Sequence, residues 1–239
     1  METSFKGPLI VEFNGLPGSG KTTLANMLKS KFEALGLPVH TRYYRYPLPK
    51  RRYLPLIMPR YYGLLFDINR LSKTLSSKKE LYIKLSFINY IQMYRDFITD
   101  KKDEIMIVDQ GLIQSLISLA YDDIINNVHP LKHLLYDSKL FDLPILFVNC
   151  YLEPEESHNR IKTRPLKKGG FRLEYVDDNK ILDILRTQEN NFNIIRKEIE
   201  SNASNSYIDI DMKATIDINI DKLLNYCTNY ITFNNGFNN

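Results

Sequence analysis

The segment GLPGSGKT, residues 15–22, constrains the fold of this chain more than any other feature of its sequence. A short apolar run, 9–13, precedes the segment, and apolar residues recur at helical spacing after it, from 24 to 32. A glycine-rich loop between a strand and a helix can direct backbone N–H groups and the positive end of the helix dipole at phosphate oxygens. The segment therefore predicts a phosphate-binding loop at the first strand-to-helix turn of an α/β fold.

The side chains of this loop have separate predicted tasks. We expect Lys21 to be an exposed cation that binds the β- and γ-phosphates of a nucleotide, and the Thr22 hydroxyl to bind Mg²⁺. The alternative, a glycine-rich turn with a chance lysine, does not account for the strand before it and the helix after it. The predicted nucleotide-binding residues of the loop are Gly15, Pro17, Gly18, Ser19, Gly20, Lys21, Thr22 and Thr23.

Strand and helix patterns alternate after the loop, as expected of a parallel sheet with helices on both faces. The predicted strands are Leu9–Phe13, Val39–Tyr43, Ile105–Asp109, Ile145–Tyr151 and Tyr207–Ile210. The predicted later helices are Tyr61–Leu75, Lys79–Ile98, Leu112–Asn126, Glu153–Arg164, Asn179–Glu200 and Ile216–Ile231. At 239 residues the chain is expected to form a single domain, 1–239, that ends in a flexible polar tail, 233–239.

Asp109 stands at the end of an apolar strand, at the sheet edge where ligands collect in parallel α/β folds. A carboxylate there can hold Mg²⁺, directly or through water, and could take the proton of an acceptor hydroxyl. Asp109 could instead cap the helix that begins near Leu112, and the two roles can coexist. The predicted metal ligands are Thr22 and Asp109.

Two further cationic groups point to a phosphorylated ligand. Arg160 and Arg164 lie four residues apart, on one face of a predicted helix, and the loop PLKKGGFR follows them, so we predict a lid at 164–173 that closes over the phosphates. The alternative is a solvated basic helix end.

In the long insertion 44–102 and just before it, arginine alternates with tyrosine. This pattern suits a phosphorylated ring-bearing acceptor, single-stranded nucleic acid, or an exposed basic loop without a specific ligand.

The composition of the chain constrains its ligands and its location only weakly. The net charge of +4 favours anionic ligands, and the two cysteines show no metal or disulfide spacing. The apolar runs are too short to cross a bilayer. We therefore expect a cytoplasmic protein without membrane contact, for which nucleic acid is not the main partner, and we leave a homodimer open.

Several motifs resemble the nucleoside-monophosphate-kinase group of P-loop kinases, and most closely thymidylate kinases. FNGLPGSGKTT resembles FEGLDGSGKTT of that family, and LLFDINR, 64–70, resembles the stretch that carries its acceptor-binding Asp-Arg pair. The resemblance implies a three-layer P-loop NTPase fold with a helical acceptor-binding insertion at 44–102. It also implies that ATP is the co-substrate and that Mg²⁺ is required. The residues to which it gives catalytic roles are Lys21, Asp109, Arg160 and Arg164, and Arg160 would also bind ATP. The predicted acceptor site comprises Arg42, Arg45, Asp67, Arg70 and Gln110.

The chain also departs from that family. Where thymidylate kinases carry Asp-Arg-Tyr, this sequence has Asp109-Gln110-Gly111, so one cation near the reacting phosphates is missing. We therefore predict a kinase for a nucleotide-like or other phosphorylated small molecule, without assigning thymidylate. Two alternatives stay open: a nucleotide-dependent nucleic-acid-binding or regulatory P-loop protein, and a kinase for a nucleoside, sugar or other neutral hydroxyl acceptor.

Overall fold

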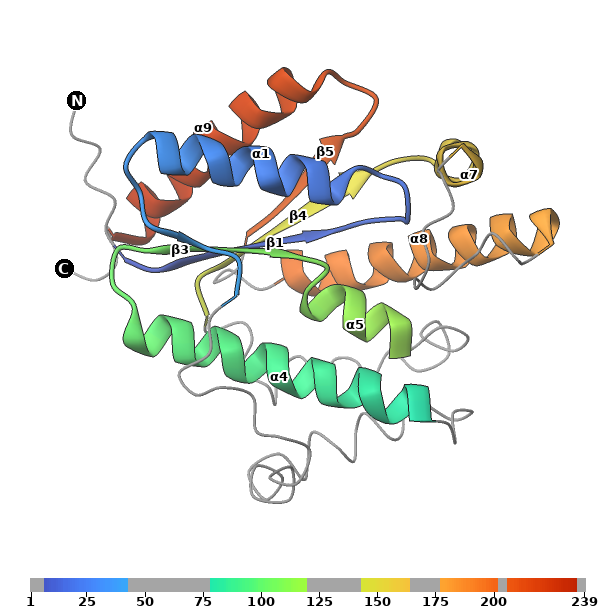
Figure 1. The fold of residues 1–239 in the computed structure, drawn as a ribbon, viewed down its shortest axis with the longest axis horizontal. Helices are drawn as coiled ribbons and strands as arrows, with labels where there is room; N and C mark the ends of the chain where they lie inside the picture. The colour runs from blue at the N-terminus through green and yellow to red at the C-terminus, as the bar shows by residue number, and fades with distance from the viewer. Residues whose placement is uncertain (1–6, 43–77, 120–142, 164–176, 202–205, 236–239) are drawn as a thin grey trace.

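A five-stranded parallel sheet lies between two layers of helices in this computed structural model (Figure 1). The structure describes residues 7–42, 78–119, 143–163, 177–201 and 206–235. The strands are β1 (Leu9–Asn14), β2 (Val39–His40), β3 (Ile105–Asp109), β4 (Ile145–Tyr151) and β5 (Ser206–Asp211). Their order across the sheet is β2-β3-β1-β4-β5, and every neighbouring pair is parallel. The predicted α/β fold with helices on both faces is confirmed.

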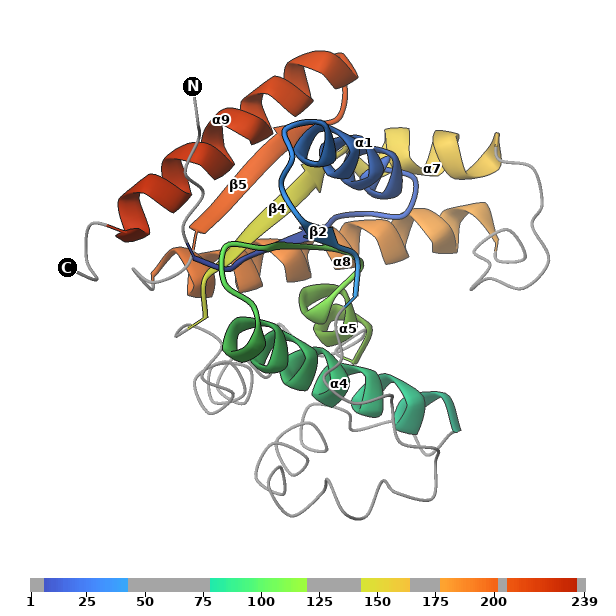
Figure 2. The same cartoon turned by 60° about the vertical axis from the view of Figure 1, so that its left-hand side comes forward.

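The sheet separates two hydrophobic cores because side chains alternate along each strand. Leu9 and Val11 of β1 pack toward α1 (Lys21–Ala34) and α9 (Ile216–Asn235) on one face. Ile10 packs on the opposite face, toward α4 (Lys78–Asp100), α5 (Leu112–Leu119) and α8 (Asp178–Glu200). Figure 2 shows these two layers on either side of the strands. The short helix α7 (Pro154–Lys162) follows β4 at the carboxyl edge of the sheet.

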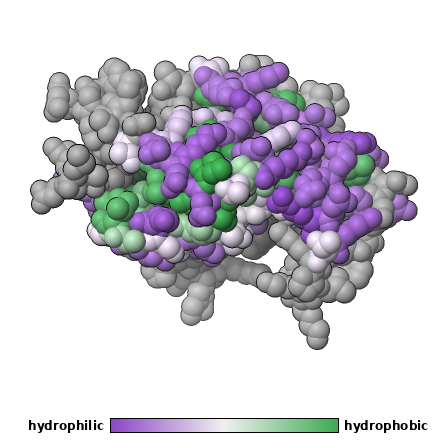
Figure 3. Space-filling view, turned by 90° about the horizontal axis from the view of Figure 1, so that it is seen from above, coloured by the Kyte–Doolittle hydropathy of each residue, from purple (hydrophilic) through white to green (hydrophobic). Residues whose placement is uncertain are grey.

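The α1 and α9 layer closes one side of the molecule. Leu24 and Leu28 of α1, and Leu223 and Cys227 of α9, are buried beneath it. Figure 3, which views this side from above, shows a mainly hydrophilic surface with smaller apolar areas. These helices are therefore amphipathic covers of the sheet. Within the part of the chain that the structure describes, no helix is both long enough and apolar enough to span a membrane.

Two predicted boundaries were wrong. The second strand was expected to run to Tyr43, but β2 has only two residues and the chain bends at Thr41. An edge strand pairs on one side only, so little holds it extended beyond its ladder with β3. The last helix was expected to end at Ile231, but α9 continues to Asn235 because no helix breaker precedes Gly236.

Other predictions fall where the structure describes nothing. The structure does not describe the predicted helix Tyr61–Leu75, residues 120–126 of the predicted helix Leu112–Asn126, any of the lid 164–173, or residues 236–239 of the predicted tail. So do four predicted site residues, Arg45, Asp67, Arg70 and Arg164. The helices α4, α7 and α8 match their predictions to within two residues at each end.

Candidate nucleotide-binding site

The predicted phosphate loop connects β1 to α1 at the carboxyl edge of the sheet. Gly15 has a φ of +139°, and a Cβ atom there would lie 2.6 Å from the carbonyl oxygen of Cys150 on β4. Only glycine fits so close to a neighbouring strand. The loop ends at Gly20, the N-cap residue of α1. The first N–H groups of a helix have no partner inside it, so this end of α1 can bind an anion.

Lys21 lies inside the loop, and the prediction that it would be exposed was wrong. Its side chain is only 6% exposed. The Nζ atom donates hydrogen bonds to the carbonyl oxygens of Gly15 (2.9 Å) and Leu16 (2.8 Å). The loop backbone curves around the ammonium group, which explains its burial. Lys21 is therefore already held where the loop would meet a phosphate.

Thr22 and Asp109, the two predicted metal ligands, lie within hydrogen-bond distance of each other at the edge of the sheet. Pairing of β1 with β3 sets Asp109 opposite Phe13, one strand away from the loop. The Thr22 hydroxyl donates a hydrogen bond of 2.5 Å to Oδ2 of Asp109. Oδ1 of Asp109 is buried and has no hydrogen-bond partner within the described residues. Two hard oxygen donors, one of them with an unused acceptor atom, fit Mg²⁺.

No group of three or more His, Cys, Asp or Glu side chains gathers into a metal site in the ranges that the structure describes. Mg²⁺ in nucleotide sites commonly takes one or two protein ligands and completes its shell with phosphate and water oxygens. The Thr22 and Asp109 pair therefore suits a metal that arrives with a nucleotide.

Two more buried polar groups near the loop lack partners. Neither Oγ of Ser19 nor the side-chain amide of Asn14 has a hydrogen-bond partner among the described residues. An unpaired buried polar group costs about 1–3 kcal/mol, so such groups call for an occupant such as water or a ligand. Because Asn14 and Ser19 flank or belong to the loop, this observation supports a ligand site there.

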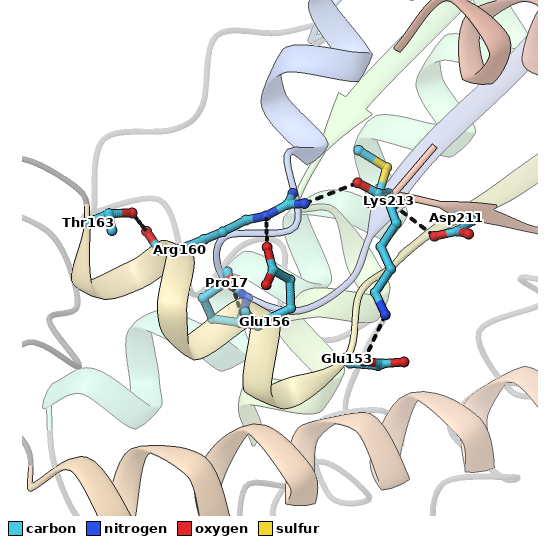
Figure 4. A network of polar contacts seen from close by, with 9 residues as sticks. Pro17, Glu153, Glu156, Arg160, Thr163, Asp211 and Lys213 are labelled. Carbon is cyan, nitrogen blue, oxygen red and sulfur yellow. Dashed lines mark hydrogen bonds and ion pairs between the residues drawn. The ribbon is translucent and has the colours of Figure 1, made fainter. Parts of the chain in front are cut away.

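Helix α7 packs against the loop and brings Arg160 to it (Figure 4). The Ser157 hydroxyl donates a hydrogen bond of 2.5 Å to the carbonyl oxygen of Pro17. A Cβ atom built on Gly18 would lie 3.5 Å from Cβ of Arg160. The Arg160 guanidinium itself donates to Oε1 of Glu156 (2.9 Å) and to the carbonyl oxygen of Met212 (3.3 Å). Arg160 thus stands beside the loop, and it must leave these partners to reach a phosphate.

The other predicted site residues that the structure describes are Gln110, Arg42 and Thr23. Gln110 is exposed and adopts a left-handed backbone with a φ of +61°, which is uncommon for a residue with a side chain. Its N–H donates to the carbonyl oxygen of Phe13. Arg42 is exposed just after β2, and Thr23 is exposed on α1. The structure therefore brings Gln110 to the edge that holds the loop, whereas within the described residues no hydrogen bond or ion pair joins Arg42 to the loop.

Sequence analysis missed Glu12, a fully buried carboxyl group in β1. Tyr94 on α4 donates a hydrogen bond of 2.5 Å to its Oε2, and the Ile113 N–H donates one of 2.7 Å to its Oε1. Glu12 therefore caps α5, the role considered above for Asp109, which contacts Thr22 instead. The available signal was a single acidic residue inside the apolar strand LIVEF.

Burial controls the protonation of Glu12. Loss of solvation raises its pKa from 4.5 to about 7, although the hydrogen bonds from Tyr94 and Ile113 oppose the rise. Between these pH values the folded chain binds a proton that the unfolded chain releases. The contribution of Glu12 to stability is thus fully present below pH 4.5 and is lost as the pH rises through about 7.

Glu12→Gln should remove this pH dependence. At 1.36 kcal/mol per pKa unit, the free energy of unfolding of the wild type, relative to that of Glu12→Gln, should fall by about 3 kcal/mol across this range. Urea unfolding of both proteins at several pH values would measure the difference. A difference that does not change with pH would contradict the assigned shift.

Gly111 marks how tightly Glu12 and Tyr94 pack. A Cβ atom at Gly111 would lie 2.4 Å from the Tyr94 hydroxyl and 2.7 Å from Cδ of Glu12. We expect Gly111→Ala to lower the free energy of unfolding by about 1–3 kcal/mol, because Tyr94 is fully buried and has little room to move. Gly36→Ala is the control, since nothing lies within 4 Å of that site and only its positive φ is strained. The two variants would be compared by urea unfolding, and an equal or smaller loss in Gly111→Ala would contradict the packing argument.

The parallel sheet and the loop after its first strand form the predicted three-layer P-loop NTPase fold. A solved structure of deoxyadenosine kinase from M. mycoides with bound dCTP matches with a TM-score of 0.50 at 14% sequence identity, covering 92% of this chain and 99% of that chain. The same enzyme with bound dATP matches with a TM-score of 0.49 at 12% identity, covering 91% and 98%. With the products dCMP and a flexible dCDP, it matches with a TM-score of 0.47 at 16% identity, covering 92% and 98%.

No family model matches the chain, and no curated protein sequence matches it either. The likeness to solved structures is one of fold, and it agrees with the predicted three-layer P-loop NTPase fold. It does not single out thymidylate kinases.

Proposed function

We propose that this chain is an ATP-dependent kinase that transfers the γ-phosphoryl group to a nucleoside or a nucleoside monophosphate. The observation that carries the proposal is the convergence of the loop, the buried Lys21 ammonium and the Thr22–Asp109 pair at one edge of the sheet. Phosphoryl transfer needs this combination of positioned cations and metal-binding oxygens.

The described residues suggest a division of roles. The N-terminus of α1 and Lys21 would bind the phosphates of ATP, with Lys21 exchanging its two loop carbonyls for phosphate oxygens. Thr22 and Asp109 would hold Mg²⁺, which neutralises charge on the phosphates when it is bound. Arg160 would add positive charge after release from Glu156. We also retain Arg164 of the lid as a sequence-based proposal.

The acceptor is proposed on two grounds. The first ground is the group of cations predicted at the acceptor site, which favours a phosphorylated acceptor such as a nucleoside monophosphate. These cations are Arg42, Arg45 and Arg70, and Asp67 would orient Arg70. The matched structure is described as a deoxyadenosine kinase, an enzyme named for a neutral nucleoside. Gln110 at the sheet edge, where thymidylate kinases carry arginine, is compatible with a neutral acceptor because it offers hydrogen bonds without charge.

An acceptor screen tests the proposal. ADP formation from ATP and Mg²⁺ would be followed with nucleosides, nucleoside monophosphates, sugars and single-stranded nucleic acid as additions. We expect a nucleoside or a monophosphate to stimulate ADP formation, with little dependence on salt. Stimulation only by nucleic acid, with an affinity that falls steeply as salt rises, would instead support a nucleic-acid-dependent protein.

A further inference from the structure

Glu12 and Tyr94 connect elements that the proposed function otherwise leaves unrelated. Glu12 lies in β1, two residues before the strand ends, and Tyr94 lies on α4, whose sequence forms the end of the insertion 44–102. Both side chains are fully buried. Their hydrogen bond, together with the bond from Ile113 to Glu12, joins β1, α4 and the start of α5 at one point.

This point lies directly against the turn from β3 to α5. The turn consists of Asp109, Gln110 and Gly111, and its last residue has no space for a Cβ atom because Glu12 and Tyr94 occupy that space. The N–H of Gln110 is bound to the carbonyl oxygen of Phe13, the neighbour of Glu12 in β1. The carbonyl oxygen of Gly111 accepts hydrogen bonds from the N–H and the hydroxyl of Ser115. Contacts on several sides therefore hold the turn in place, and Glu12 and Tyr94 provide the contacts on one side.

A purely structural role would make this arrangement costly. A buried carboxyl group loses its solvation, and an apolar residue of similar size at such a position is often neutral or stabilising. The five residues of β3 end at Asp109, so the path of the turn sets how Asp109 meets Thr22. A small displacement of the turn would separate the two oxygen donors. Directional hydrogen bonds resist such a displacement better than apolar contacts do.

We propose that Glu12 and Tyr94 are positioning residues for the Mg²⁺-nucleotide site. They hold the turn from β3 to α5 so that the Asp109 carboxylate stays within hydrogen-bond distance of the Thr22 hydroxyl. This inference rests on the proposed function in so far as the site binds a magnesium nucleotide. It adds that the end of the insertion, through Tyr94 on α4, is physically connected to the metal-binding aspartate.

The test measures binding and needs no acceptor and no turnover. The affinity for a non-hydrolysable ATP analogue would be determined by calorimetry with and without Mg²⁺. The readout is the Mg²⁺ gain, which is the factor by which Mg²⁺ raises this affinity. We expect Tyr94→Phe to reduce this gain by about 10-fold, as is typical when a group that orients a metal ligand is removed. Affinity without Mg²⁺ should stay unchanged, because the loop and Lys21 are untouched.

Variants of Glu12 separate positioning from stability. Glu12→Gln can still accept from Ile113 and can donate to the Tyr94 hydroxyl, so it should keep most of the gain. Glu12→Leu removes both contacts and should reduce the Mg²⁺ gain about as much as Tyr94→Phe does. The double variant Glu12→Leu with Tyr94→Phe should show no further reduction of the gain. Tyr207→Phe is the matched control: it removes the hydroxyl of a partly buried tyrosine on β5, which two strands separate from β3 in the sheet. It should leave the gain unchanged.

The outcomes distinguish the two proposals. A folded Tyr94→Phe protein that keeps the full Mg²⁺ gain would overturn the positioning role and leave the proposed function intact. If Glu12→Leu does not fold, Tyr94→Phe and Glu12→Gln still decide. A wild-type protein whose affinity for the analogue does not depend on Mg²⁺ would contradict both proposals, whereas an absence of kinase activity with normal Mg²⁺-dependent binding would contradict only the proposed function.

Discussion

Lys21→Ala is expected to lower the turnover number for phosphoryl transfer by about 100-fold or more. The ammonium group is buried in the loop and is bound to two carbonyl oxygens that a phosphate could replace. Removing a preorganised charge from a transferring phosphoryl group removes an interaction that strengthens in the transition state. Steady-state kinetics with the best acceptor of the screen would measure the effect.

Because Lys21 is buried, its loss can also disturb the loop, and two controls address this. Lys21→Met keeps the aliphatic stem and should lose activity to a similar degree while preserving the packing. Lys31→Ala removes an exposed lysine from the same helix and should leave turnover unchanged. Thermal unfolding of each variant would confirm that the fold persists. Turnover like that of the wild type in folded Lys21→Met would refute the assigned role of the ammonium group.

Asp109→Asn is expected to have the second large effect, a loss of about 100-fold in turnover together with a higher Mg²⁺ requirement. The amide oxygen can still accept the hydrogen bond from Thr22, so the change removes charge with little change of shape. Turnover measured across a range of Mg²⁺ concentrations would separate the two effects, since added metal should restore part of the activity.

A second aspartate at a strand end provides the matched control. Asp211 closes β5 on the same sheet, and its carboxylate accepts a hydrogen bond from the N–H of Lys213. Asp211→Asn should change neither the turnover nor the Mg²⁺ requirement. If Asp109→Asn and Asp211→Asn behave alike, Asp109 does not have the metal-binding role.

The sequence was sufficient for the sheet and the loop because both depend on local patterns. Each of the apolar runs that became β1, β3 and β4 is buried on both faces, and such runs are distinctive in a parallel sheet. The glycines at 15, 18 and 20 mark positive φ angles that the structure contains. The position of Asp109 beside the loop could be predicted because it ends a strand, and the ends of parallel strands lie at one edge of the sheet.

Features that depend on contacts between distant residues were not predicted. Glu12 and Tyr94 are 82 positions apart, and no local pattern indicates that they meet. The burial of Lys21 results from the curvature of the loop, which the residue types do not specify. The left-handed backbone of Gln110 is unusual for its residue type and follows from the turn that the surrounding contacts impose.

The central claim is that the γ-phosphoryl group of ATP moves to a nucleoside or a nucleotide. The most direct test incubates the protein with ATP that is radiolabelled at the γ-phosphate, Mg²⁺ and the acceptor that best stimulates ADP formation, and separates the products by chromatography. We predict that the label appears in the phosphorylated acceptor, in an amount equal to the ADP formed, and that Lys21→Met abolishes it. Label that appears only in inorganic phosphate, or that never leaves ATP with any acceptor, would contradict the claim.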